Sequence, residues 1–237
     1  CRRLLHSDDT VRDGAYVIFL HGWGGNSSAF SLSADMLKRS GYRAITPDFC
    51  GFGDSAEPDS PRGVPEYADD ILSLMEQNGI SEAVLVGHSF GGRVALEIAA
   101  KHPERVRGLV LVDAAGLKPR RKPSYYIKVA FHKLSVKMGG KGLAGSSDYR
   151  ALSPVMKECF KRIVNYDQTP LLPLVKCPTA IFWGRDDRDT PFCMAKRFNR
   201  GIADSHVFPL KGGHFAYLTD CDEFLSVLRA FVREITK

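Results

Sequence analysis

Residues 82–100 read EAVLVGHSFGGRVALEIAA and join a short apolar run to a helix-forming run through a Gly-x-Ser-x-Gly turn. The apolar run at 83–86 is rich in β-branched residues, as is typical of a strand covered on both faces, and helical spacing begins at Arg93. A sharp strand-to-helix turn crowds the backbone, so residues without a Cβ are needed on both sides of its apex. This pattern predicts that Ser89 projects from the apex as a nucleophile. It also places the Phe90 N–H at a helix N-terminus, where developing negative charge is stabilised.

The rest of the chain alternates between strand-length apolar runs and stretches with helical spacing. The runs lie at residues 16–20, 43–46, 106–112, 179–183 and 206–210. Such alternation predicts parallel strands joined by right-handed crossovers. We therefore expect an α/β fold, with a mostly parallel, twisted sheet and helices on both faces.

The alternation breaks between residues 118 and 172, where basic pieces bearing glycine and proline surround two expected helices. This segment holds 12 Lys or Arg residues against three acids, a net charge of +9, whereas the whole chain carries +6. We predict a core formed by residues 1–117 and 173–237, with an inserted helical lid at 118–172. Outside this lid the net charge is therefore negative.

The first expected lid helix, at 125–138, has one apolar face that includes Tyr126 and Phe131. We predict that these two side chains contact the substrate. Three lysines interspersed on the helix would then attract an anionic substrate or make weak contact with a membrane surface. The alternative is that the apolar face packs on the body of the protein and the lysines are simply solvated.

A serine hydroxyl is a poor nucleophile near neutral pH, so it needs a general base and a third group that orients the base. Of the seven histidines, His214 follows the last predicted strand after two glycines. Its loop therefore lies at the carboxyl edge of the sheet, toward which Ser89 points. The sequence predicts His214 as the base.

The orienting acid is expected from the loop that follows the strand at 179–183, on the same edge of the sheet. Asp186, Asp187 and Asp189 compete there, and Asp113, at the end of the preceding strand, is a further candidate. The pattern of residues alone leaves these alternatives open.

The chain order of serine, acid and histidine resembles that of the α/β-hydrolase superfamily, as do the His-Gly pair after the first strand, the G-x-S-x-G turn and the W-G-x-x-D stretch. The resemblance covers nearly the whole chain. In that family's pattern the acid lies three residues after the glycine, which implies Asp187. It also implies that the Trp23 backbone N–H joins that of Phe90 in an oxyanion hole. His21 and Gly22 are then expected to contact the substrate.

The composition is that of an ordinary globular protein, with 44% hydrophobic and 25% charged residues and no apolar run near the ~18 residues of a membrane span. The six cysteines are scattered without a C-x-x-C pair, so we expect reduced, buried thiols, no zinc site and a cytoplasmic location. No aromatic-interleaved motif accompanies the basic charge, so no nucleic-acid partner is expected. The sequence makes no prediction of the oligomeric state.

Together these features predict a serine hydrolase, an esterase-like enzyme that cleaves a small-molecule carboxylic ester through an acyl-enzyme, without a metal or organic cofactor. Fold and triad do not separate this activity from hydrolysis of a thioester, an amide or a carbon–carbon bond next to a ketone. A binding protein that keeps the fold with little turnover is the alternative from another class.

Overall fold

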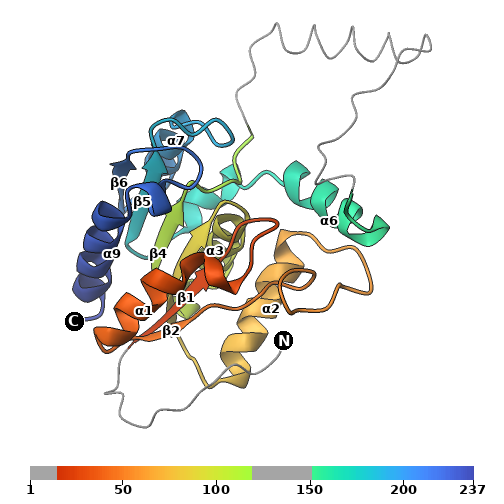
Figure 1. The fold of residues 1–237 in the computed structure, drawn as a ribbon, viewed down its shortest axis with the longest axis horizontal. Coiled ribbons are helices and arrows are strands. Elements are labelled where there is room, and N and C mark those ends of the chain that lie inside the picture. The colour runs from red at the N-terminus through yellow and green to blue at the C-terminus, as the bar shows by residue number, and fades with distance from the viewer. Residues whose placement is uncertain (1–14, 119–150) are drawn as a thin grey trace, which may run out of the picture.

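The structure, a computed structural model, describes residues 15–118 and 151–237 (Figure 1). Its strands form one six-stranded sheet in the order β2-β1-β3-β4-β5-β6. The strands are β1 (Tyr16–Leu20), β2 (Arg43–Ile45), β3 (Ala83–His88), β4 (Val106–Val112), β5 (Thr179–Gly184) and β6 (Ser205–Leu210). Each neighbouring pair in this sheet is parallel, which confirms the expected α/β fold.

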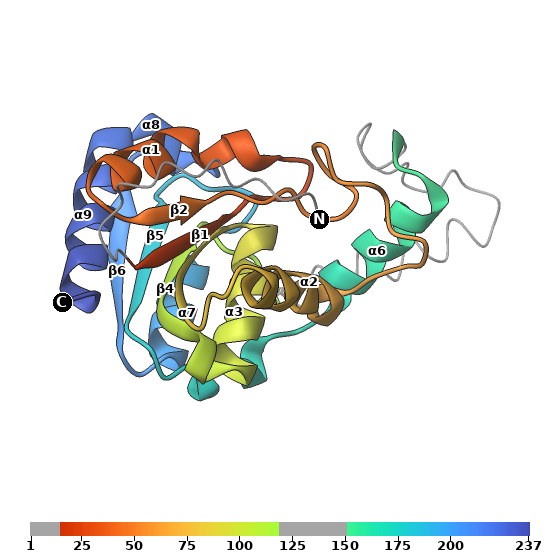
Figure 2. The same ribbon diagram turned by 90° about the horizontal axis from the view of Figure 1, so that it is seen from below.

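Helices cover both faces of the sheet (Figure 2). The α-helices are α1 (Ser31–Arg39), α2 (Val64–Gln77), α3 (Phe90–Lys101), α6 (Pro154–Asn165), α7 (Cys193–Gly201), α8 (Ala216–Thr219) and α9 (Cys221–Ile235). Short 3-10 turns lie at Ser27–Phe30, Pro103–Arg105 and Thr169–Leu174. Helices α1, α8 and α9 lie on one face, and α2, α3 and α7 lie on the other.

The strands are apolar on both sides because each face of the sheet belongs to a separate core. In β1, Val17 and Phe19 pack with residues of α1 and α9, whereas Ile18 and Leu20 pack with residues of α2 and α3. A strand buried on both faces needs apolar residues at every position rather than at alternate ones. This is why the strands read as continuous apolar runs in the sequence.

The order of the strands places a topological switch point between β1 and β3. The chain leaves β1 toward α1 on one face and leaves β3 toward α3 on the opposite face. In open α/β sheets a crevice forms outside the carboxyl ends of the strands at such a point. The His-Gly-Trp loop after β1 and the Ser89 turn after β3 therefore flank this crevice.

The turn at Ser89 depends on close approach between backbones. A Cβ added to Gly91 would overlap the carbonyl of Leu20, and one added to Gly87 would overlap the carbonyl of Gly91. Ser89 itself has φ 50° and ψ −107°, a backbone conformation that residues with a Cβ rarely adopt. The two glycines bring α3 so close to β1 that the turn is held in this strained form.

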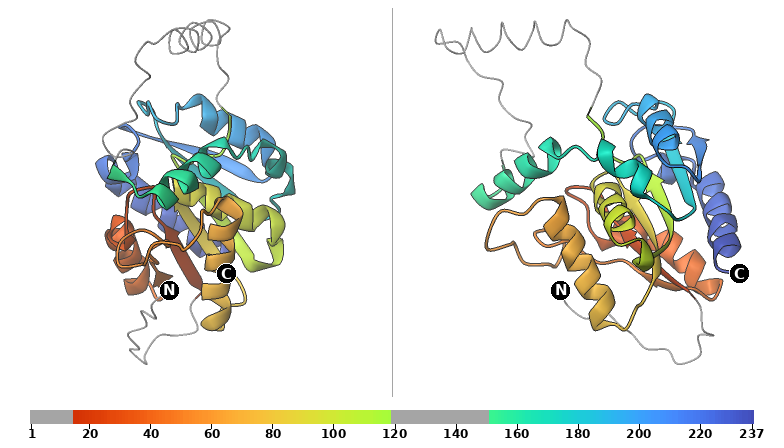
Figure 3. Two further views of the ribbon diagram at one scale, coloured as in Figure 1. Left: turned by 90° about the vertical axis from the view of Figure 1, so that its right-hand side faces the viewer. Right: turned by 180° about the vertical axis from the view of Figure 1, so that it is seen from behind.

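Part of the predicted lid lies within the described residues. Helix α6 belongs to it, and the 3-10 turn at Thr169–Leu174 crosses its predicted end at residue 172, whereas the expected helix at 125–138 lies outside the described residues. Figure 3 shows α6 beside the loop between β2 and α2, where the Arg162 guanidinium donates to the Pro61 carbonyl at 2.7 Å. The domain boundaries at 118 and 172 stay a prediction.

The thiols only partly match the sequence-based expectation. Among the described residues, Cys50, Cys159, Cys177, Cys193 and Cys221 are free thiols. Cys159 and Cys177 are buried, as expected, but Cys193 is exposed. No helix within the described residues has the length and apolar character needed to cross a membrane.

The close approach of Gly91 to the Leu20 carbonyl can be tested by measuring the free energy of unfolding of glycine variants. Gly91→Ala would force a Cβ against the Leu20 carbonyl, so we expect it to destabilise the fold by about 3 kcal/mol. Gly79 has φ +66° but open space around its Cα, so Gly79→Ala should lose only about 1 kcal/mol through backbone strain. Urea unfolding at 25 °C measures both, and equal losses would contradict the proposed overlap.

Candidate active site

The candidate active site is built from loops that leave the carboxyl ends of five strands. The loops after β1, β3, β4, β5 and β6 carry His21, Ser89, Asp113, Asp187 and His214, respectively. The strand register brings these ends together, because Leu20 pairs with Gly87, and His88 pairs with Val112. Residues far apart in the sequence therefore meet at one edge of the sheet.

Ser89 lies directly beside the loop that follows β1. A Cβ built on Gly22 would be 3.5 Å from the Ser89 Cβ, so the two backbones are in close contact. Phe90 is the first residue of α3, and the first N–H groups of a helix have no partner within the helix. The predicted oxyanion donors, the N–H groups of Trp23 and Phe90, thus belong to residues that flank Ser89 and Gly22.

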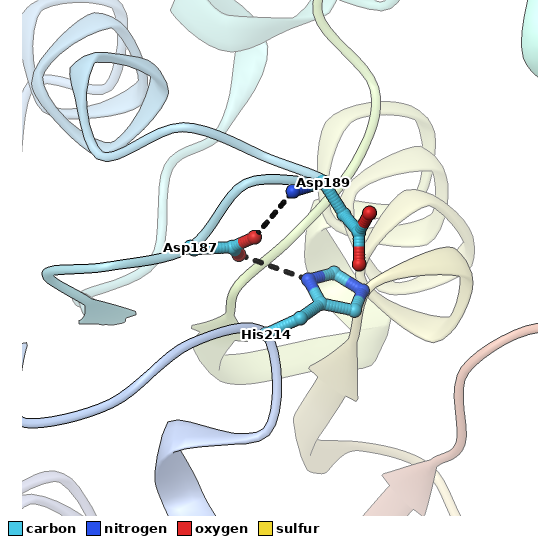
Figure 4. Close-up of side chains that lie close together, drawn as sticks. All are labelled: Asp187, Asp189 and His214. Carbon is cyan, nitrogen blue, oxygen red and sulfur yellow. Dashed lines mark hydrogen bonds and ion pairs between the residues drawn. The ribbon is translucent and has the colours of Figure 1, made fainter.

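His214 and Asp187 form a direct pair. The His214 Nδ1 and the Asp187 Oδ2 are 2.9 Å apart, and the Asp187 side chain is fully buried (Figure 4). Asp186, the neighbouring candidate, is exposed. Because a carboxylate only accepts, the Nδ1 atom carries the proton in the neutral imidazole and the Nε2 atom is left as a base.

Thr190 and the backbone of its loop complete the environment of Asp187. The Oδ1 atom accepts the N–H groups of Asp189 and Thr190 at 2.8 and 3.0 Å. The Oδ2 atom lies 2.6 Å from the Thr190 hydroxyl in addition to its bond with His214. Thr190 is not among the site residues predicted from the sequence, although a threonine three residues after an aspartate is a typical local turn pattern.

Asp187, Asp189 and His214 are also close enough together to be compared with a metal centre. Among the described residues, ligand atoms of Asp187, Asp189 and His214 lie within 4.8 Å of one another. An ionised carboxylate offers about four lone-pair positions, and those of Asp187 already receive four protein donors. This arrangement fits an acid that orients a base better than it fits a metal ligand.

The charges in the pair are set by opposing effects. Burial alone would raise the pKa of Asp187, but hydrogen bonds from His214 and Thr190 outweigh it, and the pKa is lowered. Burial alone would lower the pKa of His214, but its hydrogen bond to Asp187 and the charge of that carboxylate, with a smaller contribution from Asp189, raise it above the ordinary value. Figure 4 places Asp189 on the side of the ring away from Asp187. The site therefore stabilises an imidazolium facing an ionised aspartate.

Asp113 behaves differently from Asp187, although both are buried at strand ends. Its Oδ1 atom accepts the Gly184 N–H at 2.7 Å, and its Oδ2 atom has no hydrogen-bond partner within the described residues. Burial, together with the charge of Asp187, raises the pKa of Asp113 to about 8. At neutral pH this carboxyl group is therefore mostly protonated.

His21 is held inside the protein, contrary to the expectation that its side chain contacts substrate. Its ring is 1% exposed and lies against Phe49 and Phe52. The Nε2 atom accepts the Phe49 N–H at 3.1 Å, and Nδ1 lies 2.8 Å from the Gly22 carbonyl. Burial lowers the pKa of His21, so the ring is neutral and serves to fix the loop that carries Gly22.

Aromatic side chains surround the other flank of the site. The partly exposed Trp23 ring contacts Phe52, Phe90 and Phe160, with centroid distances of 4.8, 5.6 and 5.3 Å. Phe160 belongs to α6, so the described part of the predicted lid reaches the loop after β1. Tyr126 and Phe131, the predicted substrate contacts, lie outside the described residues.

Comparisons with known proteins identify the family to which the fold belongs. A family model described as the alpha/beta hydrolase fold matches residues 16–130. The chain is 30% identical to a 2-hydroxy-6-oxo-6-phenylhexa-2,4-dienoate hydrolase of Comamonas testosteroni, across 98% of this chain and 92% of that protein. It is 26% identical to an AB hydrolase superfamily protein of Bacillus subtilis, across 94% of this chain and 93% of that protein.

A solved structure shares the fold at lower sequence identity. The enol-lactonase from Burkholderia xenovorans superposes with a TM-score of 0.74 at 20% identity, covering 94% of this chain and 92% of that chain. At that identity the likeness speaks for the fold alone. With the relative from Comamonas testosteroni matched over nearly its whole length, the chain belongs to the α/β-hydrolase family and is a hydrolase.

Proposed function

We propose that this hydrolase cleaves a small-molecule carboxylic ester through an acyl-enzyme formed on Ser89. The observation that carries the proposal is the contact between the buried Asp187 and the partly exposed His214, 2.9 Å apart, at the same sheet edge as a strained serine turn. A nucleophile, a base and an orienting acid are the parts that acyl transfer requires.

In the acylation step, the His214 Nε2 takes the proton of Ser89 as the hydroxyl oxygen attacks the ester carbonyl. Negative charge then develops on the carbonyl oxygen, and the N–H groups of Trp23 and Phe90 stabilise it. The imidazolium returns its proton to the departing alcohol, and the C–O bond of the ester breaks. Asp187 holds the ring in its tautomer and stabilises the imidazolium by its charge.

In the deacylation step, water takes the place of the alcohol. His214 accepts a proton from the water as its oxygen attacks the acyl carbon, and the same two N–H groups stabilise the second oxyanion. Collapse of this intermediate returns the proton to Ser89 and releases the carboxylic acid.

The partly exposed Trp23 ring lies beside these donors. This position favours a substrate with an apolar acyl or alcohol group.

Hydrolysis of a carbon–carbon bond next to a ketone is a second candidate, which the relative from Comamonas testosteroni favours. The compound in that protein's name carries a ketone, an enol and a carboxylate but no ester or amide bond. Its hydrolysis must therefore break a bond next to a carbonyl carbon. The same serine, base and oxyanion donors would serve that reaction, so substrates rather than the fold must separate the two.

The assignment of the nucleophile and of the acid is tested by covalent labelling. A fluorophosphonate should label the wild-type protein once, and Ser89→Ala should abolish the labelling. Asp187→Asn should slow labelling by roughly 10³-fold or more, because the imidazole loses the partner that fixes its tautomer and stabilises its charge. Asp186→Asn, the matched control on the exposed neighbour, should react as the wild type does.

Two outcomes of the labelling experiment would contradict the proposal. Persistent labelling of Ser89→Ala would move the nucleophile elsewhere. A slow Asp186→Asn variant beside a normal Asp187→Asn variant would show that the wrong acid was chosen.

The bond that is cleaved is tested with a substrate panel. We expect turnover of p-nitrophenyl esters of graded acyl length, with a burst of p-nitrophenol that reports the acyl-enzyme, and no turnover by Ser89→Ala. The panel includes 2-hydroxy-6-oxo-6-phenylhexa-2,4-dienoate, whose consumption is followed by its absorbance. If only this compound is consumed, the ester proposal fails and the carbon–carbon hydrolase takes its place.

The protonated state of Asp113 is tested by measuring the free energy of unfolding as a function of pH. A carboxyl group whose pKa is raised on folding contributes its full stabilisation at a pH below ~3.9, its pKa in the unfolded chain. That stabilisation is lost as the pH rises toward and through the pKa of the group in the folded protein. Asp113→Asn has no such loss, so its stability relative to the wild type should grow by at least about 2 kcal/mol between pH 4 and pH 8. Urea unfolding at several pH values measures the difference. A difference that stays constant over this range would mean that Asp113 is ionised in the folded protein.

A further inference from the structure

His88, the residue before the nucleophile, lies where three loops of the site meet. Its ring is 2% exposed, and its Nε2 atom lies 2.8 Å from the backbone carbonyl of His214. The two imidazole rings have centroids 4.8 Å apart. On the opposite loop, a Cβ built on Gly22 would lie 2.8 Å from the His88 Nδ1, so the ring edge rests against that backbone.

The contact with the carbonyl fixes the tautomer of His88. A carbonyl oxygen can only accept a hydrogen bond, so Nε2 must carry the proton and Nδ1 must be bare. The rings of Phe215 and Tyr217, with centroids 5.1 Å away, pack against the imidazole and hold it in place. His88 is therefore a rigid donor aimed at the backbone of the base.

We propose that His88 is a positioning residue, whose Nε2–H holds the His214 backbone so that the catalytic imidazole stands over Ser89. The inference rests on the proposed role of His214 as the base. No side chain other than this ring joins the turn at Ser89 to the His214 loop by a hydrogen bond within the described residues. A donor at this position thus sets the separation of nucleophile and base from the backbone side.

The neutral state of His88 is also important for its proposed role beside His214. The titratable groups that act on it are His214, His21 and Asp187, from the loops after β6, β1 and β5. Burial first, and then the neighbouring His214, lower the pKa of His88 to about 3. The ring therefore stays neutral while His214 becomes an imidazolium during catalysis, and no like charge opposes that step.

The first experiment compares two substitutions that differ in the donor. His88→Gln keeps an N–H donor on a side chain of similar reach, whereas His88→Met keeps similar volume without a donor. For His88→Met we expect the fluorophosphonate labelling rate to fall roughly 10- to 100-fold, and for His88→Gln to stay within about threefold of the wild type. With the best ester of the panel, the loss should fall on kcat and leave KM nearly unchanged, because the base moves and the substrate pocket does not.

His102→Gln and His102→Met are the matched controls, since that side chain is 43% exposed at the end of α3. Both should label at the wild-type rate. Equal rates for the Gln and Met variants of His88, or losses that merely follow a lower Tm, would overturn the positioning role.

A measurement on the wild-type protein covers the case in which His88→Met does not fold. In protein labelled with ¹⁵N-histidine, the two-bond ¹⁵N–¹H correlations of the imidazoles report each tautomer. The expected result is a neutral Nε2–H form of His88 from pH 5 to pH 9. An Nδ1–H form, or a titration within this range, would overturn the proposal. If the wild type is not labelled by the fluorophosphonate, the proposed function fails, while these spectra still decide the state of His88.

Discussion

The site depends on the close approach of α3 to the end of β1. Gly91 places its Cα against the carbonyl of Leu20, and this contact leaves no room for a Cβ. Any larger residue would push α3 away from the sheet, relax the strained turn at Ser89 and separate the Phe90 N–H from the loop that carries Trp23. Strain of this kind persists only when the surrounding structure over-determines it, and here two cores on opposite faces of the sheet hold the strands that carry the turn.

Two buried carboxyl groups at neighbouring strand ends take different charge states because their partners differ. Asp187 receives four donors, so its lowered pKa keeps it ionised despite burial. Asp113 receives the Gly184 N–H on one oxygen, while the other oxygen has no hydrogen-bond partner among the described residues, and its pKa is raised to about 8. Two ionised carboxylates so close together would repel, so the protonated state of Asp113 favours an ionised Asp187, which is the carboxylate that pairs with His214.

The sequence predicted most of the fold because parallel strands buried on both faces leave continuous apolar runs. The run at 106–112 matches β4, whereas β3 and β5 extend to His88 and Gly184, since backbone pairing continues past the last apolar side chain. The pairing of His214 with a carboxylate after β5 was also predictable, because chain order and sheet topology place both at one edge. Thr190 and His88 were not predictable, because their roles arise only where loops from different strands meet. The burial of the His21 ring, which keeps it from contacting a substrate, was not predicted for a similar reason. Phe49, which packs against the ring, lies 28 residues away in the sequence.

Three histidines lie within this one edge of the sheet, and their hydrogen-bond partners give them different tasks. His21 accepts an N–H at Nε2, which makes it a neutral Nδ1–H tautomer that secures the loop of Gly22. His88 donates from Nε2 to a carbonyl, which makes it the opposite neutral tautomer. Only His214 faces a carboxylate, and its pKa is raised while burial lowers those of the other two. In the proposed mechanism, a proton taken from Ser89 therefore resides on His214 alone, because it is the one ring of the three whose partner stabilises a positive charge.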